Sequence, residues 1–190
     1  MIHPPLYILR HGQTTWNAEH RIQGRLDSPL TDQGRTQAQH QNVILKSQNL
    51  AGFSAYCSPQ GRAVETAKRA LDGLNITPTY DTRLAEIGVG DWEGLRRDDL
   101  IVDRPLDESE ESALDLYERA PGREGFQALH ARCLAFLSDL KGPSILITHG
   151  ITSRMLRVIL QDLSIADIGS IEGGQGIVFH MTDGHSNHLT

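Results

Sequence analysis

Histidine and arginine side chains stand at the ends of two apolar segments, and they are the residues of this chain best suited to chemistry. Arg10 closes the apolar run that begins at Leu6, and His11 follows it, while His149 follows a second run, Ser144–Thr148. A guanidinium binds phosphate oxygens through a planar fork of donors, and a neutral imidazole is a nucleophile near pH 7. These residues predict a site that holds a phosphoryl group, with His11 attacking it and His149 hydrogen-bonding to it.

Such a site also needs a second cation for the phosphoryl oxygens and a proton for the leaving alkoxide. Arg62, in Ser58-Pro59-Gln60-Gly61-Arg62, lies at the expected start of a helix, where backbone N–H groups also favour anions. Gly150 opens another expected helix directly after His149. Glu86 is the carboxylate best placed by the sequence to act as general acid. The arginines would take the place of a metal ion, so neither a metal nor another cofactor is expected.

Each of these short segments is a weak signal when taken alone. An Arg-His-Gly or Thr-His-Gly triplet arises by chance, and an isolated Glu86 is more often a surface carboxylate. Outside a disordered-looking tail at His185–His188, no histidine or aspartate spacing predicts a metal site. The prediction therefore depends on the combination of two histidines at strand ends, an arginine at a helix start and a glutamate in a turn.

Strands and helices are expected to alternate along the chain. Apolar runs predict strands at Leu6–Arg10, around Cys57, at Ser144–Thr148 and at Gly176–Met181. The spacing of apolar residues predicts helices at Thr31–Leu50, from about Gln60 to Leu71, at Gly125–Lys141 and at Ile151–Leu160. This order predicts an α/β fold with much parallel pairing, in which the carboxyl ends of the strands form the ligand crevice.

Composition narrows the class of protein. A chain of 190 residues suits one domain, expected over residues 1–190, and its net charge of −6 argues against binding to nucleic acid or an anionic membrane. We see no signal peptide and no apolar stretch of the roughly 20 residues that a bilayer requires. Cys57 and Cys133 fit a reducing cytosol better than a disulfide, so a cytoplasmic protein is expected. Nothing in the sequence indicates the oligomeric state.

An acidic segment separates the expected core elements. Asp103–Arg119 contains seven acidic residues and two arginines. We interpret the region at about 97–122 as a lid-like excursion with a short helix from Ser112 to Glu118, although a solvated surface loop without a function fits the pattern equally well. As a lid, it would disfavour substrates with several phosphates.

Taken together, these segments resemble a known family. Leu9-Arg10-His11-Gly12-Gln13-Thr14, with Trp16-Asn17, is similar to the signature of the histidine phosphatase superfamily in its phosphoglycerate mutase-like branch. The resemblance continues, in order and over most of the chain, through Gln23-Gly24, Ser58-Pro59, Arg62-Ala63, Leu84 to Glu86, Trp92-Glu93-Gly94 and Thr148-His149-Gly150. It implies a three-layer α/β/α sandwich with a mostly parallel central sheet and a reaction that needs no metal.

The resemblance also implies a role for each matching residue. The catalytic residues would be His11 as the phosphorylated nucleophile, Glu86 as the proton donor and His149. The phosphate would be bound by Arg10, Asn17, Arg62 and Gly150, and the substrate by Thr14, Gln23 and Gly24. Asn17 and Gln23 are assigned from the resemblance alone.

The function implied is a phosphatase that hydrolyses a small phosphorylated metabolite through a phosphohistidine. A cofactor-dependent phosphoglycerate mutase is the main alternative. Mutases of the family carry a basic, tyrosine-containing stretch after the catalytic glutamate, whereas this chain has Ile87–Gly94 there, as phosphatases do. A phosphate-sensing domain without turnover is a further alternative, although His11 and Glu86 are both present. Arg123-Glu124-Gly125 departs from the usual Gly-Glu-Ser, which leaves the physiological ester open.

Overall fold

The centre of the protein is one six-stranded mixed sheet. The computed structural model describes residues 3–103, 114 and 116–190. The strands are β1 (Leu6–Arg10), β2 (Ser54–Cys57), β3 (Pro78–Tyr80), β4 (Ser144–Thr148), β5 (Val178–Thr182) and β6 (His185–Leu189), in the spatial order β3-β2-β4-β1-β5-β6. The four strands from β3 to β1 are parallel, whereas β5 and β6 pair antiparallel. The predicted α/β fold with a mostly parallel sheet is confirmed.

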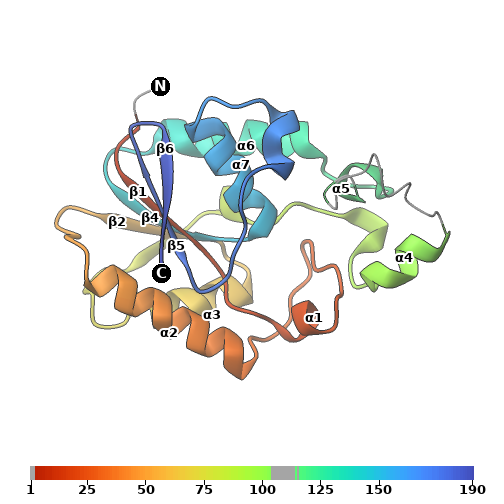
Figure 1. Ribbon diagram of the computed structural model, residues 1–190, viewed down its shortest axis with the longest axis horizontal. Coiled ribbons are helices and arrows are strands. Elements are labelled where there is room, and N and C mark those ends of the chain that lie inside the picture. The colour runs from red at the N-terminus through yellow and green to blue at the C-terminus, as the bar shows by residue number, and fades with distance from the viewer. Residues whose placement is uncertain (1–2, 104–113, 115) are drawn as a thin grey trace.

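Helices cover both faces of this sheet (Figure 1). The helices α2 (Asp32–Lys46) and α3 (Gly61–Ala70) lie on one face, and α6 (Phe126–Asp139) and α7 (Gly150–Leu160) lie on the other. Because both faces are covered, the central strands β1 and β4 are apolar along almost their whole length. Two clusters of buried apolar residues, one under each helical layer, form the core. The predicted three-layer arrangement is confirmed.

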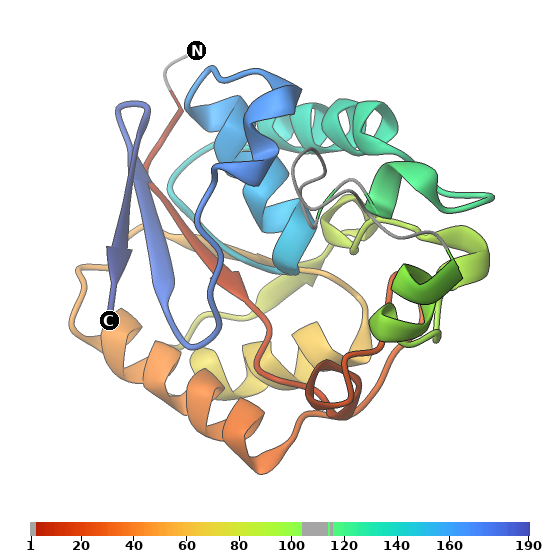
Figure 2. The same ribbon diagram turned by 45° about the vertical axis from the view of Figure 1, so that its right-hand side comes forward.

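Short helices gather at one end of the molecule. The helix α1 (Thr15–Ala18) follows β1, and α4 (Arg97–Asp103) and α5 (Leu116–Arg119) follow the turns after β3. Both views place α1 and α4 at the end toward which β1 and β4 run (Figures 1 and 2). An isolated bridge between Arg21 and Arg96 ties the two segments together. Three 3-10 turns complete the described elements, at Thr82–Leu84, Gly90–Trp92 and Ile165–Gly169.

The predicted helices form, with shifts at their ends. Thr31 is the N-cap of α2, and its hydroxyl accepts a hydrogen bond from the Gly34 N–H at 3.1 Å. The helix ends at Lys46, four residues before the predicted Leu50, because the Ser47 hydroxyl hydrogen-bonds the Ile44 carbonyl at 2.7 Å and competes with the helical pattern. The other three predicted helices begin or end within two residues of the predicted positions.

The carboxyl-terminal tail was predicted wrongly. The segment that looks disordered in the sequence forms β6, the edge strand of the sheet. Asp183 and Gly184, both with positive φ, make the two-residue turn that joins β5 to β6. Asp-Gly is a strong hairpin signal, so the sequence contained the information. The polar composition of β6 suggested a disordered tail. An edge strand buries little of its surface, however, so it can be polar and still form.

The acidic excursion lies largely outside the described residues, since 104–113 and 115 are not described. Of the predicted short helix at Ser112–Glu118, residues 112, 113 and 115 fall in that gap, and the described part shows α5 at Leu116–Arg119. No described helix is long and apolar enough to cross a membrane.

Candidate active site

Parallel pairing of β1 and β4 brings the two predicted histidines together. Arg10 lies opposite Thr148 in the register, and the His11 N–H donates to the Thr148 carbonyl at 3.0 Å. His149 then caps α7 directly after β4. The two imidazole rings lie with centroids 5.1 Å apart and planes tilted by 58°. The strand ends therefore position two histidines that are 138 residues apart in the chain.

The hydrogen bonds of the His11 ring leave one nitrogen ready to react. Its Nδ1 lies 2.7 Å from the Gly12 carbonyl oxygen. A carbonyl only accepts hydrogen bonds, so Nδ1 carries the hydrogen and the lone pair of the neutral ring is on Nε2.

His149 is held in a different way. Its Nε2 lies 2.7 Å from the Ser58 hydroxyl, which itself accepts from the Gln60 N–H at 3.3 Å. The hydroxyl hydrogen is therefore available to Nε2, and in that arrangement Nδ1 of His149 carries the ring hydrogen. Within the described residues this buried Nδ1 has no hydrogen-bond partner.

Both histidines are held in the neutral form. His11 is 2% exposed and His149 is 0% exposed. Burial, followed by the positive charge of Arg62 and smaller contributions that include Arg10, lowers the pKa of each imidazole well below its usual value of 6.5. A neutral His11 at physiological pH is the state that a nucleophile requires.

Arg62 is buried at the start of α3 and fixed by the loop that precedes α2. Its Nη1 donates to the Leu26 carbonyl at 2.7 Å and to the Asp27 carboxylate at 3.0 Å, and its Nη2 donates to the Gly24 carbonyl at 3.0 Å. These contacts leave Nε, which is buried and has no partner among the described residues. Gly24 thus contributes its carbonyl to the position of Arg62.

Arg10 faces the amino terminus of α7. A Cβ atom placed on Gly150 would lie 3.3 Å from Cζ of Arg10, so a glycine there leaves room for the guanidinium. In the part of the chain that the structure describes, the buried Nε of Arg10 also lacks a partner.

Glu86 also contacts the first turn of α7. Its Oε1 accepts from the N–H groups of Thr152 and Ile87, each at 3.1 Å. It also lies 3.1 Å from the Thr152 hydroxyl, whose single hydrogen is shared with the Ala85 carbonyl at 2.8 Å. Its Oε2 accepts from the Ile151 N–H at 3.2 Å. The carboxylate is thus held by the first turn of α7, which also follows His149.

A cavity of about 440 Å³ lies beside these residues. Of the residues predicted for the site, Arg10, Glu86 and Gly150 line it. His11 and His149 are buried and are not part of its described wall, and each is next in sequence to one of these lining residues.

The remaining predicted residues shape the loop after β1. Thr14 is fully buried and caps α1, because its hydroxyl accepts from the Asn17 N–H at 3.2 Å. The Asn17 side-chain oxygen accepts from the Thr14 N–H at 3.2 Å. Gln23 is buried and accepts from the Ser28 hydroxyl at 3.2 Å. None of Thr14, Asn17, Gln23 or Gly24 belongs to the described cavity wall.

Comparisons with known proteins show the family of the chain. A family model described as "Histidine phosphatase superfamily (branch 1)" matches residues 6–185. The chain belongs to the histidine phosphatase superfamily. A curated relative from Enterobacter sp. (strain 638), named "Probable phosphoglycerate mutase GpmB", is 36% identical over 156 residues, which are 77% of this chain and 69% of the relative.

Solved structures of histidine phosphatases share the fold. The mycobacterial glucosyl-3-phosphoglycerate phosphatase in complex with VO3 is 30% identical, with a TM-score of 0.77 over 93% of this chain and 92% of that chain. The alpha-ribazole phosphatase from Shigella flexneri is 25% identical, with a TM-score of 0.78 over 96% of this chain and 93% of that chain.

Three polar residues of this histidine phosphatase chain were missed by the sequence analysis as parts of the site. Ser58 holds His149, as described above. The side chain of Gln60 makes two hydrogen bonds. Its Nε2 donates to the Gly24 carbonyl at 3.0 Å, and its Oε1 accepts from the Glu86 N–H at 2.7 Å. Gln175 donates to the His11 carbonyl at 3.3 Å and to the Asn17 side chain at 3.2 Å. Gln175 lies among glycines, in Gly173-Gly174-Gln175-Gly176, and nothing in this local sequence signals its contacts.

The structure gives a reason for the glycine that follows His11. In the structure, a Cβ on Gly12 would lie 2.1 Å from the carbonyl oxygen of Gly34, in the first turn of α2. The close approach is thus between two backbone segments, and it fixes α2 against the end of β1.

Both cysteines are buried. Burial raises the pKa of Cys57 and of Cys133 to about 12, so neither thiol ionises readily. Among the described residues, no three His, Cys, Asp or Glu side chains gather closely enough to hold a metal ion.

Proposed function

We propose that this histidine phosphatase family member is a phosphatase that hydrolyses small phosphate monoesters through a phosphohistidine on His11, without a metal. The supporting observation is a set of buried, unpartnered nitrogens around that residue. Nε of Arg10, Nε of Arg62 and Nδ1 of His149 have no hydrogen-bond partner within the described chain. Buried donors are normally satisfied, so three of them beside a neutral nucleophile suit the oxygens of a phosphoryl group.

The first chemical step forms a bond from Nε2 of His11 to phosphorus and breaks the bond from phosphorus to the ester oxygen. The electron pair of that bond stays on the leaving oxygen, which takes a proton from Glu86. Arg10, Arg62, His149 and the backbone at Gly150 bind the phosphoryl oxygens, whose charge needs stabilisation during the transfer.

The second step returns the enzyme to its starting state. A water oxygen bonds to phosphorus, the bond from phosphorus to Nε2 breaks, and Glu86 takes the proton from the water. Asn17, Thr14, Gln23 and Gly24 contribute by ordering the loop that faces the phosphate and by positioning Arg62. The alcohol and orthophosphate are the products, and no redox change occurs.

A phosphoglycerate mutase is the second candidate, because the curated relatives at 35–36% identity carry that name. The two candidates share the phosphohistidine and differ in what accepts the phosphoryl group, which is water in one and a phosphoglycerate hydroxyl in the other. The names of the similar solved structures favour hydrolysis.

The test is phosphate release from a panel of monophosphate esters in excess EDTA, for wild type and His11→Ala. The panel includes 3-phosphoglycerate with and without 2,3-bisphosphoglycerate. We expect release by the wild type that is lost in the variant, and acid-labile phosphate bound to the wild type during turnover. Interconversion of phosphoglycerates without release would instead establish a mutase. Substantial release by folded His11→Ala would remove His11 from its role.

A further inference from the structure

The cavity beside the catalytic residues has a positively charged wall that the phosphoryl chemistry does not use. Four arginines line it, Arg10, Arg97, Arg154 and Arg157, and the described wall holds a single acidic residue, Glu86. The whole chain carries a net charge of −6, so this wall is a local reversal of charge. Of the four arginines, only Arg10 is assigned to the phosphoryl group.

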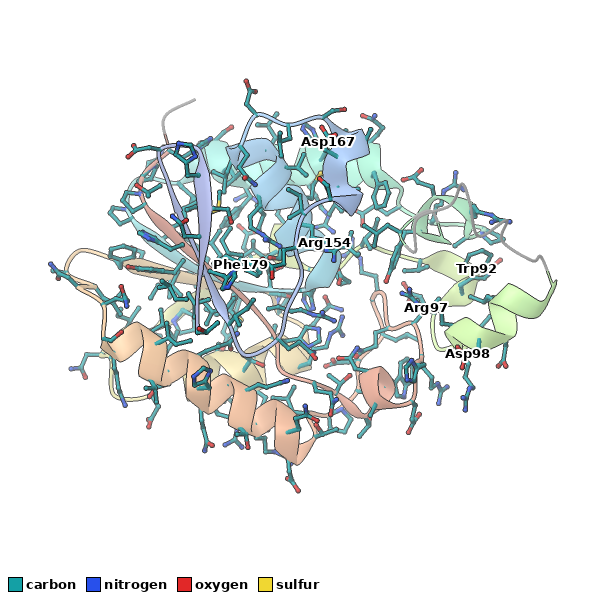
Figure 3. All side chains as sticks on the ribbon, viewed as in Figure 1. Trp92, Arg97, Asp98, Arg154, Asp167 and Phe179 are labelled. Atoms are coloured by element: carbon teal, nitrogen blue, oxygen red, sulfur yellow. The ribbon has the colours of Figure 1, made fainter. Side chains whose placement is uncertain are left out.

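Arg154 is the arginine with an uncommitted side chain. It lies in α7, five residues after His149, and no described residue makes a hydrogen bond or an ion pair with its guanidinium. Arg157, one turn further on, is committed: it donates to the carbonyls of Ser153 and Glu172 and stacks on Phe179. Figure 3 labels Phe179 and Arg154, and also Arg97, which comes from α4 across the cavity.

Two further features describe the surroundings of Arg154. A Cβ on Gly173 would lie 2.8 Å from Nη2 of Arg154, so the guanidinium packs directly against this glycine. Ser153, also in the cavity wall, is 2% exposed, and its hydroxyl has no hydrogen-bond partner within the described residues. A buried hydroxyl without a partner next to an unpaired guanidinium is a pair of donors that lacks an acceptor.

The arginines also repel one another in the absence of an anion. Burial, and then the charge of Arg154, lowers the pKa of Arg157, and Arg154 acts on Arg10 in the same direction. An anion between these groups would remove that repulsion, whereas a neutral group would not.

We propose that Arg154, with the Ser153 hydroxyl and Arg97, forms a second anion-binding subsite, which selects monophosphate esters that carry another anionic group such as a carboxylate. This inference rests on the proposed phosphatase function. A cavity of about 440 Å³ with Arg10 in its wall can hold a small metabolite whose phosphoryl group reaches His11 while its other end reaches Arg154.

The test compares 3-phosphoglycerate with glycerol 3-phosphate, which have the same carbon skeleton but differ in one carboxylate. A second comparison, of fructose 1,6-bisphosphate with fructose 6-phosphate, tests the effect of an additional phosphate. We expect the wild type to prefer the doubly anionic member of at least one pair. Arg154→Gln should lower kcat/KM for that member by about 10- to 100-fold, mainly through KM, because a hydrogen-bonded charge pair is lost. For the substrate of the pair that lacks the second anionic group, kcat/KM should change little.

Two variants serve as controls. Arg96→Gln removes the same charge from an exposed side chain outside the cavity and should leave the preference unchanged. Arg154→Lys keeps the charge without the planar fork and should restore part of the preference. If the preference that depends on Arg154 is seen with 3-phosphoglycerate, the second anion is a carboxylate. If it is seen with fructose 1,6-bisphosphate, the second anion is a phosphate.

The outcomes separate this inference from the proposed function. Hydrolysis by the wild type without a preference, or with a preference that survives in Arg154→Gln, would refute the subsite and leave the phosphatase standing. Failure to hydrolyse any ester, p-nitrophenyl phosphate included, would refute the phosphatase. In that case calorimetric binding of 3-phosphoglycerate decides the subsite: weaker binding to Arg154→Gln supports it, and equal binding rejects it.

Discussion

Replacing Glu86 with Gln separates the structural and chemical contributions of this carboxylate. Its two oxygens accept from three N–H groups, those of Ile87, Ile151 and Thr152, and Oε1 also shares the hydrogen of the Thr152 hydroxyl. An amide has one oxygen, so its NH₂ group must replace one acceptor. The better orientation keeps the oxygen at the Oε1 position, where three donors converge, and turns NH₂ toward the Ile151 N–H.

The cost follows from that geometry. One buried N–H loses its acceptor, which destabilises the fold by about 1–3 kcal/mol. For a chain of this length, each kcal/mol lowers Tm by about 2–4 °C, so we expect a fall of roughly 2–12 °C.

The chemical effect depends on the leaving group. Loss of the general acid should lower kcat/KM by about 10²- to 10⁴-fold for an alkyl phosphate. Nitrophenolate leaves without a proton, so p-nitrophenyl phosphate should lose much less. The ratio kcat/KM is the proper measure, because it covers the steps up to departure of the leaving group and excludes later hydrolysis of the phosphohistidine.

The assay is calorimetric unfolding together with the two kcat/KM values, for wild type, Glu86→Gln and Glu19→Gln. Glu19 is exposed and makes one ion pair, at 3.6 Å to Arg21, so its variant controls for the loss of a carboxylate elsewhere. Equal losses on both esters would show that Glu86 is not the acid. An unchanged Tm would show that its hydrogen bonds do not hold the start of α7.

Four further predictions test the site. Gly12→Ala should lose about 1–3 kcal/mol or more of stability in urea unfolding, because the new methyl group meets the backbone of Gly34 and no side chain can move aside. Gln175→Ala should lower kcat with little change in Tm, because Gln175 holds the loop around Asn17; a change in Tm alone would contradict this role. Below pH 6.5 the unfolded chain takes up protons that the buried His11 and His149 do not. The free energy of unfolding should therefore fall by up to about 1.4 kcal/mol per pH unit for each histidine, and His149→Gln should reduce this fall. Orthophosphate at about 100 times its Kd should stabilise the wild type by about 2.7 kcal/mol in EDTA, and less in His149→Gln; no stabilisation would contradict the anion site.

Local chemistry made part of the site predictable. His11 and His149 follow apolar strands, and parallel strands in one sheet place their carboxyl ends together, so two distant residues could be paired from the sequence alone. Arg62 was found for a related reason, since it stands at a helix start after the neighbouring strand β2. These predictions needed only the type of each element and its direction.

The contacts between loops could not be predicted in that way. Gln60 joins Gly24 to Glu86, and Gln175 joins the loop after β1 to the turn before β5. A glutamine in a turn is ordinarily a solvated residue, and its partners here depend on how loops from four strands meet. The arginine-lined cavity was missed for the same reason, because Arg97 and Arg154 come from different elements and neither lies in a recognisable motif.

The unpartnered donors and the lowered histidine pKa values have a common cause. Arg10, Arg62 and His149 are buried with nitrogens that lack acceptors within the described chain, and burial, together with the charge of the arginines, holds the histidines neutral. Each of these features costs free energy when no anion is bound, and the covered sheet and its two apolar clusters are what offset that cost. A dianionic phosphoryl group satisfies the donors and attenuates the repulsion at once. The same arrangement that is unfavourable without an anion therefore gives this acidic chain a local attraction for one.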